Sequence, residues 1–185
     1  LVWQTKTDAS LRPKLEDLKL AVEVRPDAMR LKTFSARLDG QPIRASGEWP
    51  LPAEAWEGLG SGATLPDWSQ AQGHLELQGA RVAAFSAYLP EILAREGQFN
   101  AALELKPGKR LAGTLSLTNA ATRPISTITP LRDIAAQVRF DEHRAVLERF
   151  GGQIGGQPVH ADGFVAFPNL DGNGLNYQFN LRGTN

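Results

Sequence analysis

Apolar and polar residues alternate strictly along several segments of this 185-residue chain, and no other feature constrains its fold as strongly. A period of two is typical of half-buried β-strands, in which successive side chains point to opposite faces of a sheet. The alternation predicts strands at residues 18–24, 99–105, 111–117 and 175–181, and Pro107-Gly108-Lys109 predicts a hairpin turn between the second and the third. The sequence therefore predicts a mainly β fold whose sheet has one apolar and one polar face.

Two segments depart from the alternation. Residues 81–94 carry apolar side chains at helical spacing and are interrupted by Pro90, which predicts one short amphipathic helix. The other segment, residues 52–73, contains a Gly/Ser-rich connection and marks a boundary between two parts of the chain. We therefore divide the chain into a first β meander module at 1–60, a boundary and connecting strand at 61–80, and a short helix followed by a second β meander module at 81–185.

The chain contains an internal repeat. A shift of 116 residues aligns residues 17–52 with 133–168 without a gap, and ten of the 36 aligned positions are identical. Each copy contains Gly-Gln-Pro, followed by a strand with a glycine (Gly47 or Gly163) where a side chain would obstruct close packing or a bend. We predict that each copy is a four-strand antiparallel meander, with the Gly-Gln-Pro turn between the third and fourth strands. Repeats of this kind stack into an elongated protein.

Composition narrows the functional classes. The chain has 20 basic and 20 acidic residues, and this balance argues against nucleic acid, because phosphate binding normally needs a basic face. It has no cysteine, which excludes disulfides and thiol chemistry, and no apolar run of the roughly 20 residues that a spanning helix needs. It begins at Leu1 and stops directly after a strand pattern, so we expect a fragment of a longer chain.

No group of residues predicts catalysis. His74, His143 and His160 lack the spacing of metal ligands, and no acidic pair has the separation that glycoside hydrolysis requires. The pairs Gly151-Gly152 and Gly155-Gly156 are not followed by the Lys-Ser/Thr of a phosphate loop, so they predict a strand bend or bulge. We predict no enzyme activity, no metal and no cofactor.

The stretch from residue 89 to residue 167 resembles the AsmA-like superfamily, which includes TamB and related periplasmic proteins. It contains EGQFNAALELKPGKRLAGTLSLTNAATRPI and then PLRDIAAQVRFDEHRAVLERFGGQIGGQPVHADGFVAF. In that family a helix precedes two glycine-led strands, a small-polar linker, and a meander closed by a glycine-bearing strand. The corresponding segments here are 97–105, 113–117, 119–125, and the closing strand with Val159, Ala161 and Gly163.

This resemblance implies a β-taco, an elongated curled sheet of repeated antiparallel meanders with an apolar interior. It implies a bridge-like lipid transfer protein in the periplasm, anchored to the inner membrane through a segment outside this fragment. Such a protein moves phospholipids between the inner and outer membranes and supports outer-membrane biogenesis. Its partners are phospholipid acyl chains and outer-membrane assembly proteins.

The apolar positions of the predicted strands are the candidate lining of such a groove. They are Leu18, Leu20, Val22, Leu103, Leu105, Leu115, Leu117, Val138, Val165, Tyr177 and Phe179. Alternation does not distinguish an open groove from a closed core.

Two alternative functions stay open. A scaffold or chaperone-like module would assist outer-membrane protein assembly by adding strands to its sheet edges. A carbohydrate-binding β-sandwich would instead use Trp3, Trp49, Trp56 and Trp68 as a stacking platform.

Overall fold

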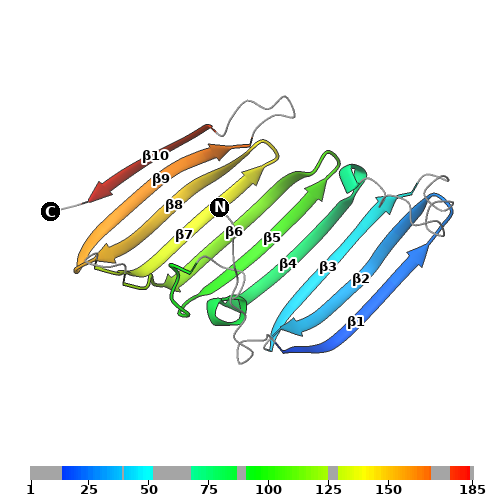
Figure 1. Ribbon diagram of the computed structural model, residues 1–185, viewed down its shortest axis with the longest axis horizontal. Helices are drawn as coiled ribbons and strands as arrows, with labels where there is room; N and C mark the ends of the chain where they lie inside the picture. The colour runs from blue at the N-terminus through cyan, green and yellow to red at the C-terminus, as the bar shows by residue number, and fades with distance from the viewer. Residues whose placement is uncertain are drawn as a thin grey trace.

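The computed structural model describes residues 14–38, 40–51, 68–86, 91–124, 129–167 and 176–183. Within them, ten antiparallel strands form a single, mildly curved sheet, in which each strand pairs with the next one along the chain (Figure 1). The strands are β1 (Leu15–Val24), β2 (Ala28–Leu38), β3 (Gln41–Pro50), β4 (Gln72–Arg81), β5 (Gln98–Lys106), β6 (Arg110–Ala120), β7 (Leu131–Asp141), β8 (Arg144–Ile154), β9 (Gln157–Ala166) and β10 (Asn176–Gly183). Two short 3-10 helices flank β4, η2 (Trp68–Gln70) before it and η3 (Val82–Phe85) after it.

The predicted β character is confirmed. The four segments predicted from alternation coincide with β1, β5, β6 and β10, although Leu175 lies outside the described residues. The predicted hairpin joins β5 to β6, and its turn contains two residues with positive φ, Gly108 at 83° and Lys109 at 59°. Local alternation and turn chemistry therefore agree with the observed strands.

The predicted amphipathic helix at residues 81–94 is not found in the described part of the chain. η3 follows β4 directly, and Leu93 forms an isolated antiparallel bridge with the segment after β6. The apolar residues pack on the sheet instead: Val82 is only 1% exposed, and the rings of Phe85 and Phe99 meet edge to face at 4.9 Å. Pro90, which lacks an N–H and clashes with a preceding helical turn, disfavours a continuous helix here.

The internal repeat is visible in the strand pairing. β1, β2 and β3 correspond to β7, β8 and β9 at the predicted offset of 116 residues. Irregularities of register recur at matching positions, after Glu16 and Arg132, after Ala21 and Gln137, and after Leu31 and Leu147. Asp17 and Asp133, at the first of these irregularities, have positive φ angles of 51° and 52°. The two copies therefore share their β-bulges as well as their strands.

Each copy contributes three strands, so the predicted four-strand unit is wrong. β2 runs through the region where we expected two strands, because the bulge between Leu31 and Phe34 absorbs the break in alternation without ending the strand. The turn into β3 contains Gly40, whose φ is 78°. In the second copy, Gly155 and Gly156 form the two-residue turn from β8 to β9, with φ angles of 58° and 84°.

The best-buried side chains lie toward the two ends of the strands. At one end Ala28, Leu51 and Ala71 are buried. At the other end η3 and the segment around residues 92–94 cover the sheet, and Ala94 N donates a hydrogen bond to Ala121 O at 2.9 Å. Within the described ranges, no second sheet and no α-helix covers the middle of the sheet.

The predicted boundary and connecting strand at residues 61–80 overlaps β4, and residues 61–67 lie outside the described residues. β3 and β4 pair from Ile43 opposite Leu77 to Glu48 opposite Gln72. The division into modules stays a prediction. No helix in the described residues has the length and apolar character needed to cross a membrane.

Candidate functional site

The strand registers align apolar side chains into rows that cross the sheet perpendicular to the strands. Directly opposed residues of neighbouring strands lie on the same face, so a row can be followed from one pairing to the next. One row crosses all ten strands without a charged residue, and we call it the long apolar row. It consists of Leu20, Phe34, Ala45, Leu75, Leu103, Gly113, Phe140, Ala145, Val165 and Tyr177.

Two further rows run parallel to the long apolar row on the same face. One spans β2 to β10 and consists of Ala36, Ile43, Leu77, Ala101, Leu115, Val138, Leu147, Gly163 and Phe179. The other spans β4 to β10 and consists of Ala80, Phe99, Leu117, Ala136, Phe150, Ala161 and Leu181. Together the rows make one face of the sheet apolar over its full width.

Every predicted lining residue except Leu18 lies in a row on this face. Val22 and Leu105 belong to a shorter row, described below, and the others belong to the three rows above. Leu18 stands in the β1 bulge beside Asp17 and has no directly opposed residue in β2. At the edge strands the lining is open to solvent: Leu20 is 61% exposed and Tyr177 is 68% exposed.

Sequence reasoning missed several residues of the same face. Leu31 and Phe34 are three positions apart, so they break the two-residue period, as do Leu147 and Phe150. The bulges restore both members of each pair to the apolar face. The repeat aligns Leu31 with Leu147 and Phe34 with Phe150, and this signal could have identified all four.

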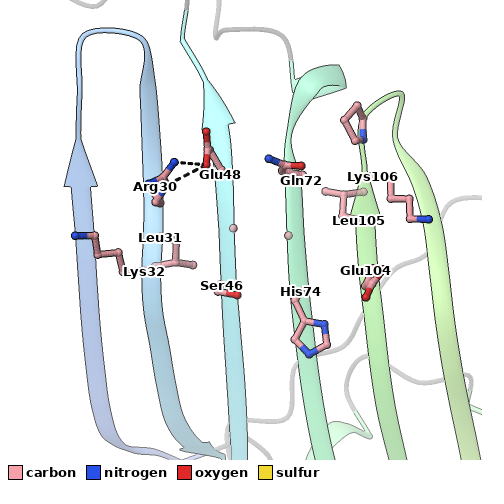
Figure 2. Close-up of a pocket in the computed structure, with 13 residues that line it drawn as sticks. Arg30, Leu31, Lys32, Ser46, Glu48, Gln72, His74, Glu104, Leu105 and Lys106 are labelled. Atoms are coloured by element: carbon pink, nitrogen blue, oxygen red, sulfur yellow. Dashed lines mark hydrogen bonds and ion pairs between the residues drawn. The ribbon is translucent and has the colours of Figure 1, made fainter.

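A notch interrupts the apolar face between β3 and β4, where Gly47 stands opposite Gly73. The two glycines lie in a row between Leu31 of β2 and Leu105 of β5, and Figure 2 shows these leucines on either side of β3 and β4. We call this depression the glycine notch. It has a volume of about 340 Å³, and its wall also includes Met29, Trp49 and Ala71.

The close approach of the two strands accounts for the glycines. A Cβ built on Gly47 would lie 2.7 Å from the carbonyl oxygen of Gln72, and one on Gly73 would lie 3.0 Å from that of Ser46. The first distance is shorter than real Cβ contacts, so Gly47 is required by the packing, as the sequence predicted.

The second repeat fills the equivalent position. Gly163 corresponds to Gly47, but its partner across the strands is Phe179 in place of a glycine. A Cβ on Gly163 would lie 2.5 Å from Cδ1 of the Phe179 ring, which shows that the ring lies over this glycine. The notch is therefore open in the first repeat and closed by an aromatic side chain in the second.

The opposite face of the sheet is polar. Ser46, His74 and Glu104 form one of its cross-strand rows, and Arg30 Nε and Nη2 donate hydrogen bonds of 2.9 and 2.7 Å to Glu48 Oε2 (Figure 2). This carboxylate holds the pKa of Arg30 above its ordinary value. A hollow of about 810 Å³ includes these polar residues and also borders Gly47 and Gly73 of the notch.

An ionic cluster joins the ends of three strands near this face. Glu142, at the tip of the β7–β8 hairpin, accepts hydrogen bonds from Lys106 Nζ at 2.5 Å and from Arg110 Nη1 at 2.7 Å. The bond from Lys106 is the main reason why the pKa of Glu142 lies below its usual range. The cluster ties the hairpin to the ends of β5 and β6.

The residues considered for other chemistry are dispersed in the described structure. His74 and His160 lie exposed within strands and His143 lies at a hairpin tip. Among the described residues no group of three His, Cys, Asp or Glu side chains could hold a metal ion. Of the four tryptophans, Trp49 lines the notch, Trp3 and Trp56 lie outside the described residues, and the side chain of Trp68 is not described.

The chain was compared with protein-family models, with curated proteins and with solved structures, and none of the three comparisons finds a match.

Proposed function

We propose that this chain forms part of an apolar path along which phospholipid acyl chains move, in a periplasm-spanning protein that supports outer-membrane biogenesis. The observation that carries the proposal is the long apolar row, which crosses ten strands without a charged side chain. The resemblance to AsmA-like and TamB-like proteins supports the same function.

The direction of the row suits transport. Strands lie roughly 4.8 Å apart, so nine intervals extend the row over roughly 43 Å, several times the width of a lipid chain. An acyl chain on this face loses contact with water at about 0.8 kcal/mol per CH₂ group. Because a membrane at either end offers nearly the same stabilisation, movement requires a continuous apolar path and no large affinity.

The bulges support a sheet that curls around its apolar face as a β-taco. Asp17, Gly79, Asn119 and Asp133 all have positive φ and stand at register shifts of β1, β4, β6 and β7. A bulge bends its strand and increases the local twist. Several bulges near one end of the strands would curve the sheet there and partly enclose a bound chain.

Site-specific photocrosslinking tests this function. A photoreactive residue at Leu103, in the long apolar row, is expected to capture phospholipid in cells. The matched control is Ala102, the preceding residue of β5, which belongs to the polar face. Phospholipid adducts at Leu103 and not at Ala102 are the expected result. Equal capture at both sites, or no capture at Leu103, would contradict the proposal.

A further inference from the structure

The repeat gives β10 a defined position in the sheet. β10 follows β9 as β4 follows β3, and the two pairings match residue by residue. Ala45 opposite Leu75 corresponds to Ala161 opposite Leu181, and Gly47 opposite Gly73 corresponds to Gly163 opposite Phe179. β10 is therefore the counterpart of β4, with Phe179 in the place of Gly73 and Leu181 in the place of Leu75.

The two counterparts differ in what lies beyond them. The outer edge of β4 is covered by antiparallel β5, with Leu75 opposite Leu103 and Gly73 opposite Leu105. Among the described residues no strand lies beyond β10. The Leu181 side chain is 74% exposed, and β10 pairs with β9 over eight residues without a register shift.

The β10 edge also lacks the features that prevent strand addition. Natural edge strands are usually protected by bulges, prolines or charged residues that face inward. β10 has no bulge and no proline, Tyr177, Phe179 and Leu181 occupy its apolar face, and its one charged residue, Arg182, lies on the polar face opposite His160. The backbone N–H and C=O groups along the outer edge of β10, away from β9, can pair with another strand.

We propose that the outer edge of β10 binds an antiparallel strand of the β5 type, with an apolar side chain at every second position. The repeat also specifies the register. The residue equivalent to Leu103 lies opposite Leu181, and the residue equivalent to Leu105 lies opposite Phe179. This strand extends the rows of the apolar face, and its binding does not depend on whether that face carries lipid.

A second copy of the chain fits the edge less well. The only other sheet edge in the described residues is β1. β1 is the counterpart of β7, whereas the repeat predicts a counterpart of β5 next to β10. β1 has two register shifts against β2, whereas β5 pairs with β6 without one. The repeat therefore favours a regular β5-type strand over β1 of another copy.

Disulfide trapping tests both the partner and the register. The chain has no cysteine, so Leu181→Cys introduces a single thiol at an exposed position. The probe is a synthetic peptide with the β5 sequence, QFNAALELK, in which the residue equivalent to Leu103 is cysteine. Opposed residues of antiparallel strands have Cα atoms about 4.5–5.5 Å apart, which suits a disulfide.

The matched control is Asn180→Cys, one residue away on the same exposed strand but on the opposite face. In a glutathione redox buffer, we expect the peptide to form the mixed disulfide with Leu181→Cys at least about tenfold more than with Asn180→Cys. A peptide with proline in place of the residue equivalent to Ala101, whose N–H faces β4 in the sheet, is expected to lose this preference, because proline cannot donate to the strand ladder.

Equal yields with the two variants would overturn the proposed register and the proposal. So would light scattering that shows the unmodified chain to be a dimer, combined with a loss of peptide trapping at Leu181→Cys at the concentrations where the dimer forms. Photocrosslinking of lipid at Leu103 is measured separately, so a failure of strand binding is distinguishable from a failure of lipid binding.

Discussion

At the scale of single residues, one cross-strand position shows how the two repeats differ. Gly47 and Gly163 are equivalent and both are held close to the neighbouring strand. The residue opposite them is Gly73 in the first repeat and Phe179 in the second. A glycine leaves an apolar depression there and a phenylalanine fills it, so the chain itself contains the closed form of the notch.

Gly73→Phe is expected to close the glycine notch. The second repeat has phenylalanine opposite the equivalent glycine, whereas a Cβ on Gly73 would lie 3.0 Å from the Ser46 carbonyl oxygen, so β3 and β4 must separate slightly and circular dichroism is used to check that the sheet persists. If an acyl chain occupies the notch, the variant removes the burial of roughly two CH₂ groups at about 0.8 kcal/mol each, which weakens binding about tenfold. Titration with a fluorescent fatty acid measures the change.

The matched control for this variant is His74→Phe, which adds the same side chain on the polar face one residue away. It should leave fatty-acid affinity unchanged. Equal affinities of Gly73→Phe and the unmodified chain would show that the notch does not hold an acyl chain.

At the scale of secondary-structure elements, the bulges are part of the repeat. Asp133 marks one of them, with a φ of 52° that a glycine adopts freely and a β-branched residue adopts only with strain. Asp133→Val is expected to destabilise the sheet by about 1–2 kcal/mol, the cost of the left-handed region for an ordinary residue. Urea unfolding measures this loss.

Asp133→Gly is the comparison for that substitution, because it removes the same carboxylate without imposing the strain. It should lie close to the unmodified chain in stability. Equal losses for the valine and glycine variants would mean that the carboxylate, and not the backbone conformation, matters at the bulge.

The Glu142 cluster links the β7–β8 hairpin to β5 and β6 and predicts a pH dependence. Because hydrogen bonding to Lys106 lowers the folded-state pKa of Glu142, the stabilisation is complete above the usual pKa of 4.5 and is lost as the pH falls through the lowered value. The free energy of unfolding should therefore decrease below about pH 4.5.

Urea unfolding at a series of pH values measures this decrease. Glu142→Gln should reduce the slope of stability against pH, and Lys106→Gln should do the same. The double variant should change the slope little further, because both substitutions remove one interaction. Unchanged slopes in both single variants would contradict a stabilising role of the cluster.

At the scale of the whole molecule, a single sheet with one apolar face depends on the continuity of its rows. Leu75→Arg places a charge in the middle of the long apolar row, at a cost of about 3 kcal/mol for an arginine in a hydrocarbon path. Transfer of a fluorescent phospholipid between donor and acceptor vesicles by the chain should fall by more than about tenfold.

Glu76→Arg adds the same side chain one residue away, on the polar face. It removes the 3.8 Å ion pair with Arg44, which is partly exposed and contributes little stability. Transfer should stay near that of the unmodified chain. Circular dichroism of both variants distinguishes a blocked path from an unfolded sheet, and equal transfer by the two folded variants would contradict the path.

The sequence by itself determined the β-strands, their two-faced character and the repeat. These features are local or periodic: alternation directs successive side chains to opposite faces, and glycine-containing turns join neighbouring strands. Ten of the eleven candidate lining residues lie in cross-strand rows on one face of the sheet, and their role as a lining stays a prediction. Leu18 has no directly opposed residue because it stands in the β1 bulge.

Only the tertiary structure decided how the strands combine. A bulge keeps β2 as one strand although its alternation breaks at Leu31 and Phe34, and tertiary packing places Val82 on the sheet without the predicted helix. The glycine notch depends on the β3–β4 register, which brings together Gly47 and Gly73 from either side of a long connection. Such a register is set by the packing of whole strands, and the local sequence around each glycine does not contain it.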